Sequence, residues 1–429
     1  MISSIVNKAK TSRVFKNISW LVGGKVVQMI IAFVINILTT RYLGNSNFGL
    51  ISYAAVYTGF FSSLCSLGLN SVIVKEMLEH KDKQGELLGT SIAMRLAASV
   101  LSWISIICLS CIIDKGEPQT TKIVGLCCIG MVFQSFTILE YWFQARLESK
   151  VCAIATIIAY LAMSAYKAVL LLLGKSVGWF AVAMSIDYIA VVVVVYIFYK
   201  KKNGPAFSFS WPTGKRLLSQ SYHFIISTLM VSIYGNTDKF MLKHMLHNTS
   251  SVGDYGAAVQ LSLAWVFVLQ AIIDSFYPSI MELHKQDYEK YRKRNIQLYS
   301  IVFYVALVAS VGITVIAKPA VLFLYKEKYI GAVEPLKVIT WYTAFSYLGV
   351  ARNAWLVCEG KQKYLKYLYG SAVVLNILIN WLLIPKFGAT GAAVASLITQ
   401  IGTSIVLPLF IKPIRENSIL MLKGITFRR

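Results

Sequence analysis

The chain has 429 residues, of which 57% are hydrophobic and only 14% are charged. Soluble domains typically carry about 25% charged residues, so this composition excludes a disordered chain, a secreted disulfide scaffold and an ordinary cytosolic enzyme. The formal net charge is +23, but there is too little polar surface for a nucleic-acid footprint, and we expect no nucleic-acid partner. The composition predicts an all-α polytopic membrane protein.

Twelve apolar runs are long enough, or nearly so, to cross a membrane as helices, which takes about 20 residues. Strands are not expected, because lipid-exposed backbone must close its hydrogen bonds within each segment. The predicted spans are residues 18–40, 48–73, 87–113, 122–143, 151–173, 178–199, 218–243, 254–281, 296–317, 331–358, 367–384 and 389–411.

The basic residues predict which ends of these spans face the cytoplasm, because cytoplasmic loops carry an excess of Lys and Arg. With the N-terminus inside, most of the 42 basic side chains fall in the predicted cytoplasmic segments and few in the external loops. We therefore expect both termini in the cytoplasm. Lys200–Lys202 and Arg292–Arg294 are candidate contacts for anionic lipid headgroups.

The chain divides into two sets of six predicted spans at a Lys-rich segment. We expect a six-helix lobe over 1–199, a cytoplasmic linker over 200–217, a second six-helix lobe over 218–411 and a cytoplasmic tail over 412–429. Halves with an even number of spans start on the same side, and an axis along the membrane normal relates such halves in many transporters.

A short internal echo supports such a repeat. Phe48-Gly49, followed by Tyr53–Ala55, comes after the first span of one half. Val252-Gly253, followed by Tyr255–Ala258, comes after the first span of the other half. Small residues at helix starts are common in membrane proteins, so the echo by itself is a thin argument.

Nothing in the sequence predicts catalysis, a metal or a cofactor. The seven cysteines are odd in number and mostly lie in apolar runs, which argues against a disulfide framework. Cys108, Cys111, Cys127 and Cys128 have no histidine near them, so a metal site is disfavoured. Gly23–Lys25 lacks the remaining residues of a phosphate-binding loop. No loop is long enough for a catalytic domain.

Charged residues within the spans are the informative set, because each costs at least roughly 2.5–3.5 kcal/mol at a lipid-facing position near the membrane centre. They are expected to face a cavity, to pair, or to extend to the membrane surface. The basic ones are Lys25, Arg95, Lys122, Lys167, Lys239, Lys243, Lys337 and Arg352, and the acidic ones are Glu140, Asp187, Asp238, Asp274 and Glu334.

Some of these charges have structural explanations. Those near span ends can extend to the surface, and Glu140 and Arg352 lie within about two helical turns of the predicted cytoplasmic face. The deeper group comprises Lys25, Arg95, Lys167 and Asp187. For this group we favour lining of a cavity over pairing. A cationic polar cavity suits an anionic hydrophilic group, such as the phosphate of a lipid carrier.

Four stretches together resemble one family. Thr40–Gly49 resembles the "R-x-L-G-x-x-x-F/Y-G" signature of bacterial polysaccharide flippases, and Ser66–Asn70 is similar to the end of their second helix. Asp238–Ala258 resembles their "D-x-x-x-L … V-G-x-Y-x-x-A" feature, and Ile384–Ala393 looks like their "P-x-x-G-x-x-G-A-A" turn. The chain thus resembles the O-antigen (Wzx-type) flippases of the multidrug/oligosaccharidyl-lipid/polysaccharide superfamily.

The turn residues within these stretches also have a structural explanation. Glycine permits tight connections between helices, and proline can end a helix. We therefore interpret Gly44, Gly49, Gly388, Gly391 and Pro385 as structural.

The resemblance implies a two-lobed bundle with a central cationic cavity in the bacterial inner membrane. It implies an undecaprenyl-pyrophosphate-linked oligosaccharide as substrate, flipped from the cytoplasmic to the periplasmic leaflet by alternating access, with protons or sodium as candidate coupling ions. An O-unit polymerase and a chain-length regulator are candidate partners. Our candidate substrate contacts are Lys25, Arg95, Lys167, Arg41 and Arg352, and our candidates for ion coupling or charge pairing are Asp187, Asp238, Asp274 and Glu140. Arg41 and Asp238 could form a pair or a gate.

Two alternatives remain. The first is a multidrug or cation antiporter of the same superfamily, whose cavity should be acidic and aromatic to attract cations. The cationic bias of the deep residues argues against it. The second is an integral-membrane enzyme, such as an O-unit polymerase or a glycosyltransferase, against which the short loops and the lack of an acidic loop motif argue.

Overall fold

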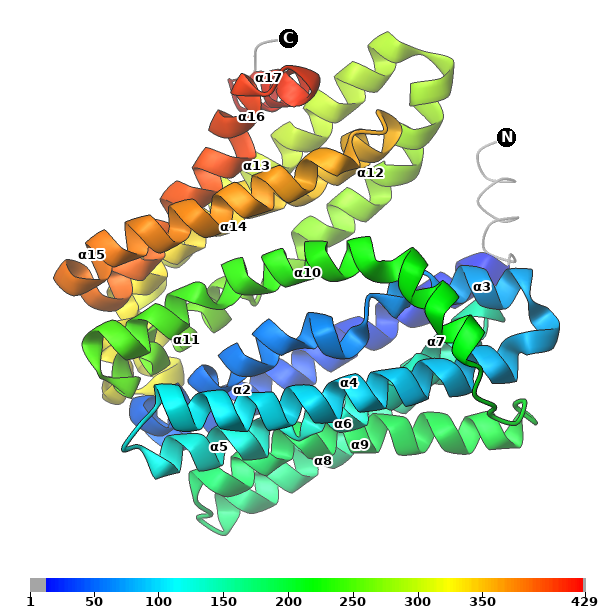
Figure 1. The fold of residues 1–429 in the computed structure, drawn as a ribbon. Coiled ribbons are helices and arrows are strands. Elements are labelled where there is room, and N and C mark those ends of the chain that lie inside the picture. Colours follow the sequence, from blue (N-terminus) through cyan, green and yellow to red (C-terminus); the bar gives the residue numbers. More distant parts are fainter. Residues whose placement is uncertain (1–12, 427–429) are drawn as a thin grey trace. The chain divides into compact units, whose positions relative to one another are not determined.

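The structure is a computed structural model that describes residues 13–426, with most side chains from Ile30 onward. Every regular element within this range is helical, as the composition predicts (Figure 1). The first half of the chain forms α2 (Arg13–Ser66), α3 (Ile73–Glu79), α4 (Gln84–Ile113), α5 (Pro118–Cys128), α6 (Gly130–Gln134), α7 (Ile138–Ala145), α8 (Ser149–Leu172) and α9 (Val177–Lys201), with short 3₁₀ turns at Leu69–Ser71, Lys81–Lys83 and Ser135–Thr137.

The second half of the chain begins with α10, the long curved helix that is drawn in green in Figure 1. Its elements are α10 (Trp211–Leu246), α11 (Thr249–Leu263), α12 (Phe267–Gln286), α13 (Tyr288–Tyr325), α14 (Val333–Cys358), α15 (Leu365–Ile401), the π-helical turn η6 (Gly402–Val406), α16 (Leu407–Phe410) and α17 (Lys412–Thr426), with 3₁₀ segments at Glu327–Ala332 and Gln362–Tyr364.

Seven helices of the described chain are long and apolar enough to cross a membrane. An eighth crossing arises if α11 and α12, which are bent by 44° at the break between them, count as one span. Two of the seven helices contain two predicted spans each, namely α2 and α15. The predicted spans in α10 and α14 carry several charges and do not qualify on composition. Twelve crossings and two cytoplasmic termini therefore remain predictions.

Glycine produces the sharp bends within α2 and α15. Gly44 has φ +73° inside α2, and Gly388 has φ +56° inside α15. A residue other than glycine is strained at such φ angles. Both glycines lie between two predicted spans, where the chain turns. Gly391 is helical, but an added Cβ would lie 2.4 Å from the carbonyl oxygen of Leu383. The structural interpretation of these glycines is confirmed.

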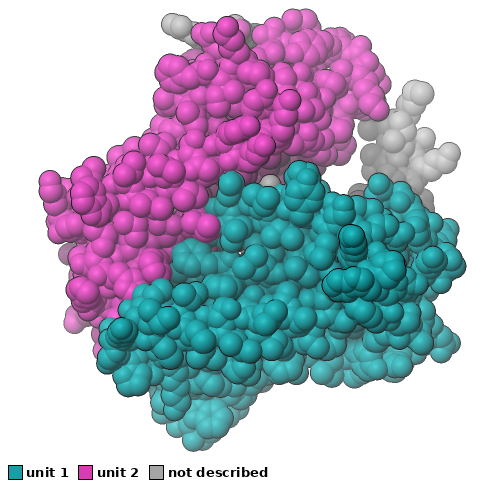
Figure 2. Space-filling model, in the orientation of Figure 1, with its two compact units in different colours: residues 1–42, 54–232 teal, residues 43–53, 233–429 magenta. Residues whose placement is uncertain are grey.

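The chain forms two compact units (Figure 2). Unit 1 contains residues 1–42 and 54–232, and unit 2 contains residues 43–53 and 233–429. The core of unit 1 includes Trp142, Phe143 and Tyr199, and that of unit 2 includes Trp355 and Tyr299. The boundary between these units lies within α10, whereas the predicted lobes divide at 200–217, and the lobe boundaries stay a prediction.

The segment 43–53 packs against α11 through a crossing of two glycines. An added Cβ on Gly49 would lie 1.9 Å from the carbonyl oxygen of Thr249, and one on Gly253 would lie 2.0 Å from that of Asn45. The hydroxyl groups of Ser46 and Thr249 are 3.1 Å apart. Gly49 is therefore structural too, and this contact explains why a segment from the first half of the sequence belongs to unit 2.

The predicted linker is not a free loop along its whole length. Residues 204–210 have no regular secondary structure and follow the first turns of α4 within unit 1. The backbone N–H of Ser208 donates to the carbonyl oxygen of Gly85 (3.3 Å), and that of Ser210 donates to Thr90 Oγ1 (2.9 Å). A Cβ on Gly89 would lie 2.4 Å from the carbonyl oxygen of Ser208, so glycine permits this close approach.

Candidate functional site

A buried carboxylate is the centre of a polar cluster inside unit 2. Asp238 lies near the end of α10 and is only 6% exposed. Its Oδ1 accepts hydrogen bonds from the amides of Asn376 (3.0 Å) and Asn380 (2.7 Å). Its Oδ2 accepts from the hydroxyl groups of Tyr255 (2.5 Å) and Ser396. Within the described part of the chain, these hydrogen-bond partners are all neutral.

The local sequence explains why these side chains meet. Asn376 and Asn380 are four residues apart and therefore share one face of α15, where the amide of Asn380 also donates to Asn376 Oδ1 (3.0 Å). The bend at Gly388 turns α15 back, which brings Ser396 to the same carboxylate. Tyr255 arrives from α11. Four segments of the chain thus converge on one acid.

The side chains of this cluster carry carboxylate, amide and hydroxyl oxygen atoms, which are the ligands that hard cations prefer. A buried ionised carboxylate is costly unless a cation or strong hydrogen bonds compensate it. Asn380 Oδ1 is buried and has no hydrogen-bond partner among the described residues, and rotation of either amide would direct an oxygen toward Asp238. The arrangement can therefore hold a small monovalent cation, or a proton on Asp238 itself.

A column of polar side chains runs from this cluster along α15. Tyr234, one turn before Asp238 on α10, donates to Gln400 Oε1 (3.0 Å), and Gln400 donates to Ser404 Oγ (2.7 Å). Arg352, only 4% exposed, donates from Nη1 to the carbonyl oxygen of Thr403 (3.3 Å) in the π-helical turn η6. π-Helical turns occur frequently at functional sites.

Unit 1 holds Arg95 in a buried setting. Arg95 lies on α4 and is 1% exposed. It donates to Asn70 Oδ1 (3.4 Å), to the carbonyl oxygen of Gln134 (3.2 Å) and to Thr137 Oγ1 (3.5 Å). These acceptors are neutral, so no carboxylate is among the hydrogen-bond partners of the guanidinium in the described chain. Glu140 is half-buried on α7, the helix that follows Thr137.

Two other deep charges pair with each other. Lys167 Nζ on α8 lies 3.9 Å from Asp187 Oδ2 on α9, and both side chains are largely shielded from solvent. Asp187 Oδ1 has no hydrogen-bond partner in the described chain. The structure thus shows the pairing alternative for Lys167 and Asp187, while their roles in transport stay predictions.

The other predicted residues are separate from these groups. The side chain of Lys25 lies outside the described part of the chain. Arg41 is exposed at the end of the first predicted span, and a pair or gate with Asp238 stays a prediction. Asp274 is exposed on α12 and accepts a hydrogen bond from Gln270 (2.8 Å).

Sequence reasoning identified Asp238 but not the side chains around it. Asn376, Asn380, Ser396 and Tyr255 are uncharged and were therefore passed over. The available signal was a pair of asparagines four residues apart in an otherwise apolar span, because polar residues facing a bundle interior form hydrogen bonds between helices.

Comparison with known proteins places this fold. A family model described as "Polysaccharide biosynthesis protein" matches residues 14–284, more than half of the chain. The chain belongs to this polysaccharide biosynthesis protein family. No curated protein matches the sequence.

The fold of this polysaccharide biosynthesis protein is shared with two groups of solved transporters. An inward-facing multidrug-resistance MATE transporter of the MOP superfamily matches with TM-score 0.72 at 14% identity, over 92% of this chain and 95% of the other. The lipid II flippase MurJ, in an inward closed conformation, matches with TM-score 0.67 at 13% identity, over 94% and 91%. The predicted all-α membrane-protein fold is confirmed, and at these identities the likeness concerns the fold alone.

Proposed function

We propose that this protein is a flippase that moves an undecaprenyl-pyrophosphate-linked oligosaccharide, an O-antigen repeat unit or a similar one, from the cytoplasmic to the periplasmic leaflet of the bacterial inner membrane by alternating access. The observation that carries the proposal is membership of a polysaccharide biosynthesis family combined with the fold of a lipid II flippase. The sugars need a polar passage and the pyrophosphate needs cations, while the polyprenyl tail can stay in lipid.

Among the described cations, Arg95 is the strongest candidate for contact with the pyrophosphate or with acidic sugars. Its bonded partners are neutral, whereas Asp187 already compensates the charge of Lys167. An arginine binds phosphate oxygens in a bidentate manner. Arg352 also lacks a bonded carboxylate in the described chain, and it joins Lys25 and Arg41 as a further candidate.

We assign ion coupling to Asp238. A carboxylate that changes between a cation-bound and a free state inside a membrane changes the local charge by one unit. In a low-dielectric interior such a change is worth several kcal/mol, which is enough to shift an equilibrium between two conformations. Asp274 is less suited, because it is exposed on α12 and bonds to Gln270 of its own helix, and Glu140 stays a further candidate.

The direct test is deletion of the gene in its host, followed by measurement of lipid-linked repeat units in each leaflet. Intact units should accumulate on the cytoplasmic side, and the wild-type gene should restore their export. Arg95→Ala and Asp238→Asn should fail to restore it at normal expression. Glu334→Gln removes an exposed carboxylate of α14 that is paired with Lys337, and this control should restore export.

One outcome would overturn the proposal. If repeat units still reach the periplasmic leaflet in the deletion strain but are not polymerised, the chain acts after the flipping step, as an enzyme or an accessory factor would. A drug antiporter, the second candidate that the shared fold allows, would instead show extrusion of cationic dyes that depends on this chain, with export of repeat units unaffected by its deletion.

A further inference from the structure

The C-terminal helix α17 is a fixed part of unit 2. Asn417 donates to the hydroxyl group of Tyr299 on α13 (2.6 Å). At the far end of α17, Ser300 donates to the carbonyl oxygen of Gly424 (2.6 Å) and Tyr304 donates to that of Ile425 (2.5 Å). These hydroxyl groups satisfy carbonyls that a helix end leaves without partners.

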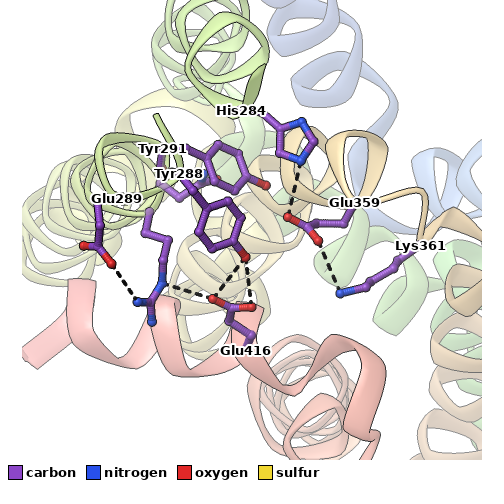
Figure 3. A network of polar contacts seen from close by, with 9 residues as sticks. His284, Tyr288, Glu289, Tyr291, Glu359, Lys361 and Glu416 are labelled. Atoms are coloured by element: carbon purple, nitrogen blue, oxygen red, sulfur yellow. Dashed lines mark hydrogen bonds and ion pairs between the residues drawn. The ribbon is translucent and has the colours of Figure 1, made fainter. Parts of the chain in front are cut away.

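The acidic residue of α17 is also used within unit 2. Glu416 is the one acid in this helix. It lies 3.0 Å from Arg292 Nε and accepts a hydrogen bond from the hydroxyl group of Tyr288 (3.3 Å), as Figure 3 shows. Glu416 lies four residues after Lys412 and seven before Lys423, so it shares their side of α17, and Arg292 of α13 compensates its charge there.

The outward face of α17 is basic with an apolar centre. Arg415, Ile419 and Lys423 follow one another at four-residue steps, so they form a single stripe along the helix. Lys412 and Arg415 are exposed, Lys423 is half-buried, and Ile419 is 38% exposed. Within the described chain none of these three cations has an ion-pair partner. The inward face buries Ile414, Leu420 and Met421.

α17 directly follows the last apolar segment of the chain. The last apolar segment ends at Phe410, whose side chain is 80% exposed. Only Ile411, in an extended conformation, separates it from α17. α17 has 15 residues, which is too short to span a bilayer. A helix with a basic and partly apolar outer face, joined this closely to an apolar segment, has the composition of helices that lie in the interface between headgroups and acyl chains.

We propose that the outward face of α17 binds anionic phospholipid headgroups, with Arg415, Lys423 and Lys412 contacting the phosphates and Ile419 entering the acyl boundary. The partner is a lipid surface because the stripe combines cations with an exposed aliphatic side chain, and because the helix starts where the apolar segment ends. On the predicted topology this is the cytoplasmic leaflet. The inference concerns lipid binding and does not depend on the proposed transport activity.

The test is native mass spectrometry of the full chain in detergent, with added phosphatidylglycerol or phosphatidylcholine. The wild type should retain phosphatidylglycerol in preference to phosphatidylcholine. The double variant Arg415→Ser/Lys423→Ser should bind phosphatidylglycerol roughly thirtyfold more weakly, from the contribution of two basic residues near an anionic surface. Arg415→Lys/Lys423→Arg should retain the binding, since it keeps both charges.

A matched control separates this surface from net charge. Lys363→Ser/Lys366→Ser removes two exposed cations from the predicted cytoplasmic end of the same unit, and binding at α17 requires that this control lose clearly less affinity for phosphatidylglycerol than the Arg415/Lys423 double variant. Unchanged melting temperatures without added lipid would show that each variant is folded. Wild-type affinity in the Arg415/Lys423 double variant, or an equal loss in the control, would overturn the proposal.

Discussion

The crossing of segment 43–53 with α11 makes a sharp prediction about Gly253. A methyl group there would lie 2.0 Å from the carbonyl oxygen of Asn45, 2.8 Å from its carbonyl carbon and 3.1 Å from its Cα. Atoms in ordinary contact are about 3.5–4.0 Å apart, so the two segments must separate by more than 1 Å. Both are backbone, and a change of side-chain rotamer cannot relieve the clash.

The expected cost of Gly253→Ala follows from this geometry. Overpacking of a tight contact costs about 1–3 kcal/mol, and a clash between backbones belongs near the upper end, about 3 kcal/mol. We expect the melting temperature in detergent to fall by several degrees. Gly49→Ala should cost as much, since its Cβ would lie 1.9 Å from the carbonyl oxygen of Thr249.

The assay is thermal unfolding of the two single variants, the double variant and a control. One separation of the two segments relieves both clashes, so the double variant should lose less stability than the two single variants together. Gly312→Ala is the control, because Gly312 on α13 has nothing within 4 Å of an added Cβ and alanine favours a helix over glycine. If Gly253→Ala and Gly312→Ala have the same melting temperature, the close crossing is refuted.

Three further predictions follow from individual groups. Asp238→Asn removes the charge of the buried cluster, and transport in vesicles with and without a sodium or proton gradient should lose its dependence on the gradient, with a rate at least about tenfold lower. Lys167→Ala should lower the melting temperature by leaving Asp187 buried without its cation, and Lys167→Ala/Asp187→Ala should recover most of that loss; no recovery would mean that the pair does not form. At the start of α13, the backbone N–H of Lys290 donates to Asp287 (3.0 Å) and lowers the pKa of that carboxyl group. A lowered folded pKa gives stability above the unfolded value, near 3.9, that is lost as the pH falls through the folded value. Asp287→Ala should therefore melt earlier at neutral pH, with a difference from the wild type that narrows below about pH 4.

The sequence alone predicts the all-helical fold class and the positions of several turns. Long apolar runs leave the backbone no option except helices in lipid, and the predicted spans lie largely in helices. The predicted span 48–73 is too long, because α2 ends at Ser66, and the span 254–281 is broken between α11 and α12. Gly44 and Gly388 were predicted as turns because glycine tolerates a positive φ, and both have one. These features depend on local chemistry, which a single sequence displays directly.

The polar cluster around Asp238 could be predicted only in part. The acid itself was visible as a charge in an apolar span. Its partners Asn376 and Ser396 lie well over a hundred residues away along the chain and meet it only because α15 bends at Gly388. Periodicity shows which residues share a face of one helix, but it does not show which other helix that face contacts. The sequence likewise predicts Arg95 as a cation deep in a span, but it does not show which neutral groups accept hydrogen bonds from it.

The contact between segment 43–53 and α11 gives a structural explanation for the repeated motifs around Gly49 and Gly253. Thr249 precedes Gly253 by four residues, and Asn45 precedes Gly49 by four residues. Each glycine thus faces the carbonyl one turn before the other glycine, which is the reciprocal pattern that two equivalent segments produce when a local two-fold axis relates them. Equivalent positions of the repeat therefore contact each other directly.

Because the contact is reciprocal, a methyl group on either glycine separates the same two segments. The nearly equal clash distances of 1.9 and 2.0 Å therefore predict nearly equal losses of stability for Gly49→Ala and Gly253→Ala. Markedly unequal losses would mean that the two halves meet without this symmetry, and the repeat would then be a coincidence of small residues at helix starts.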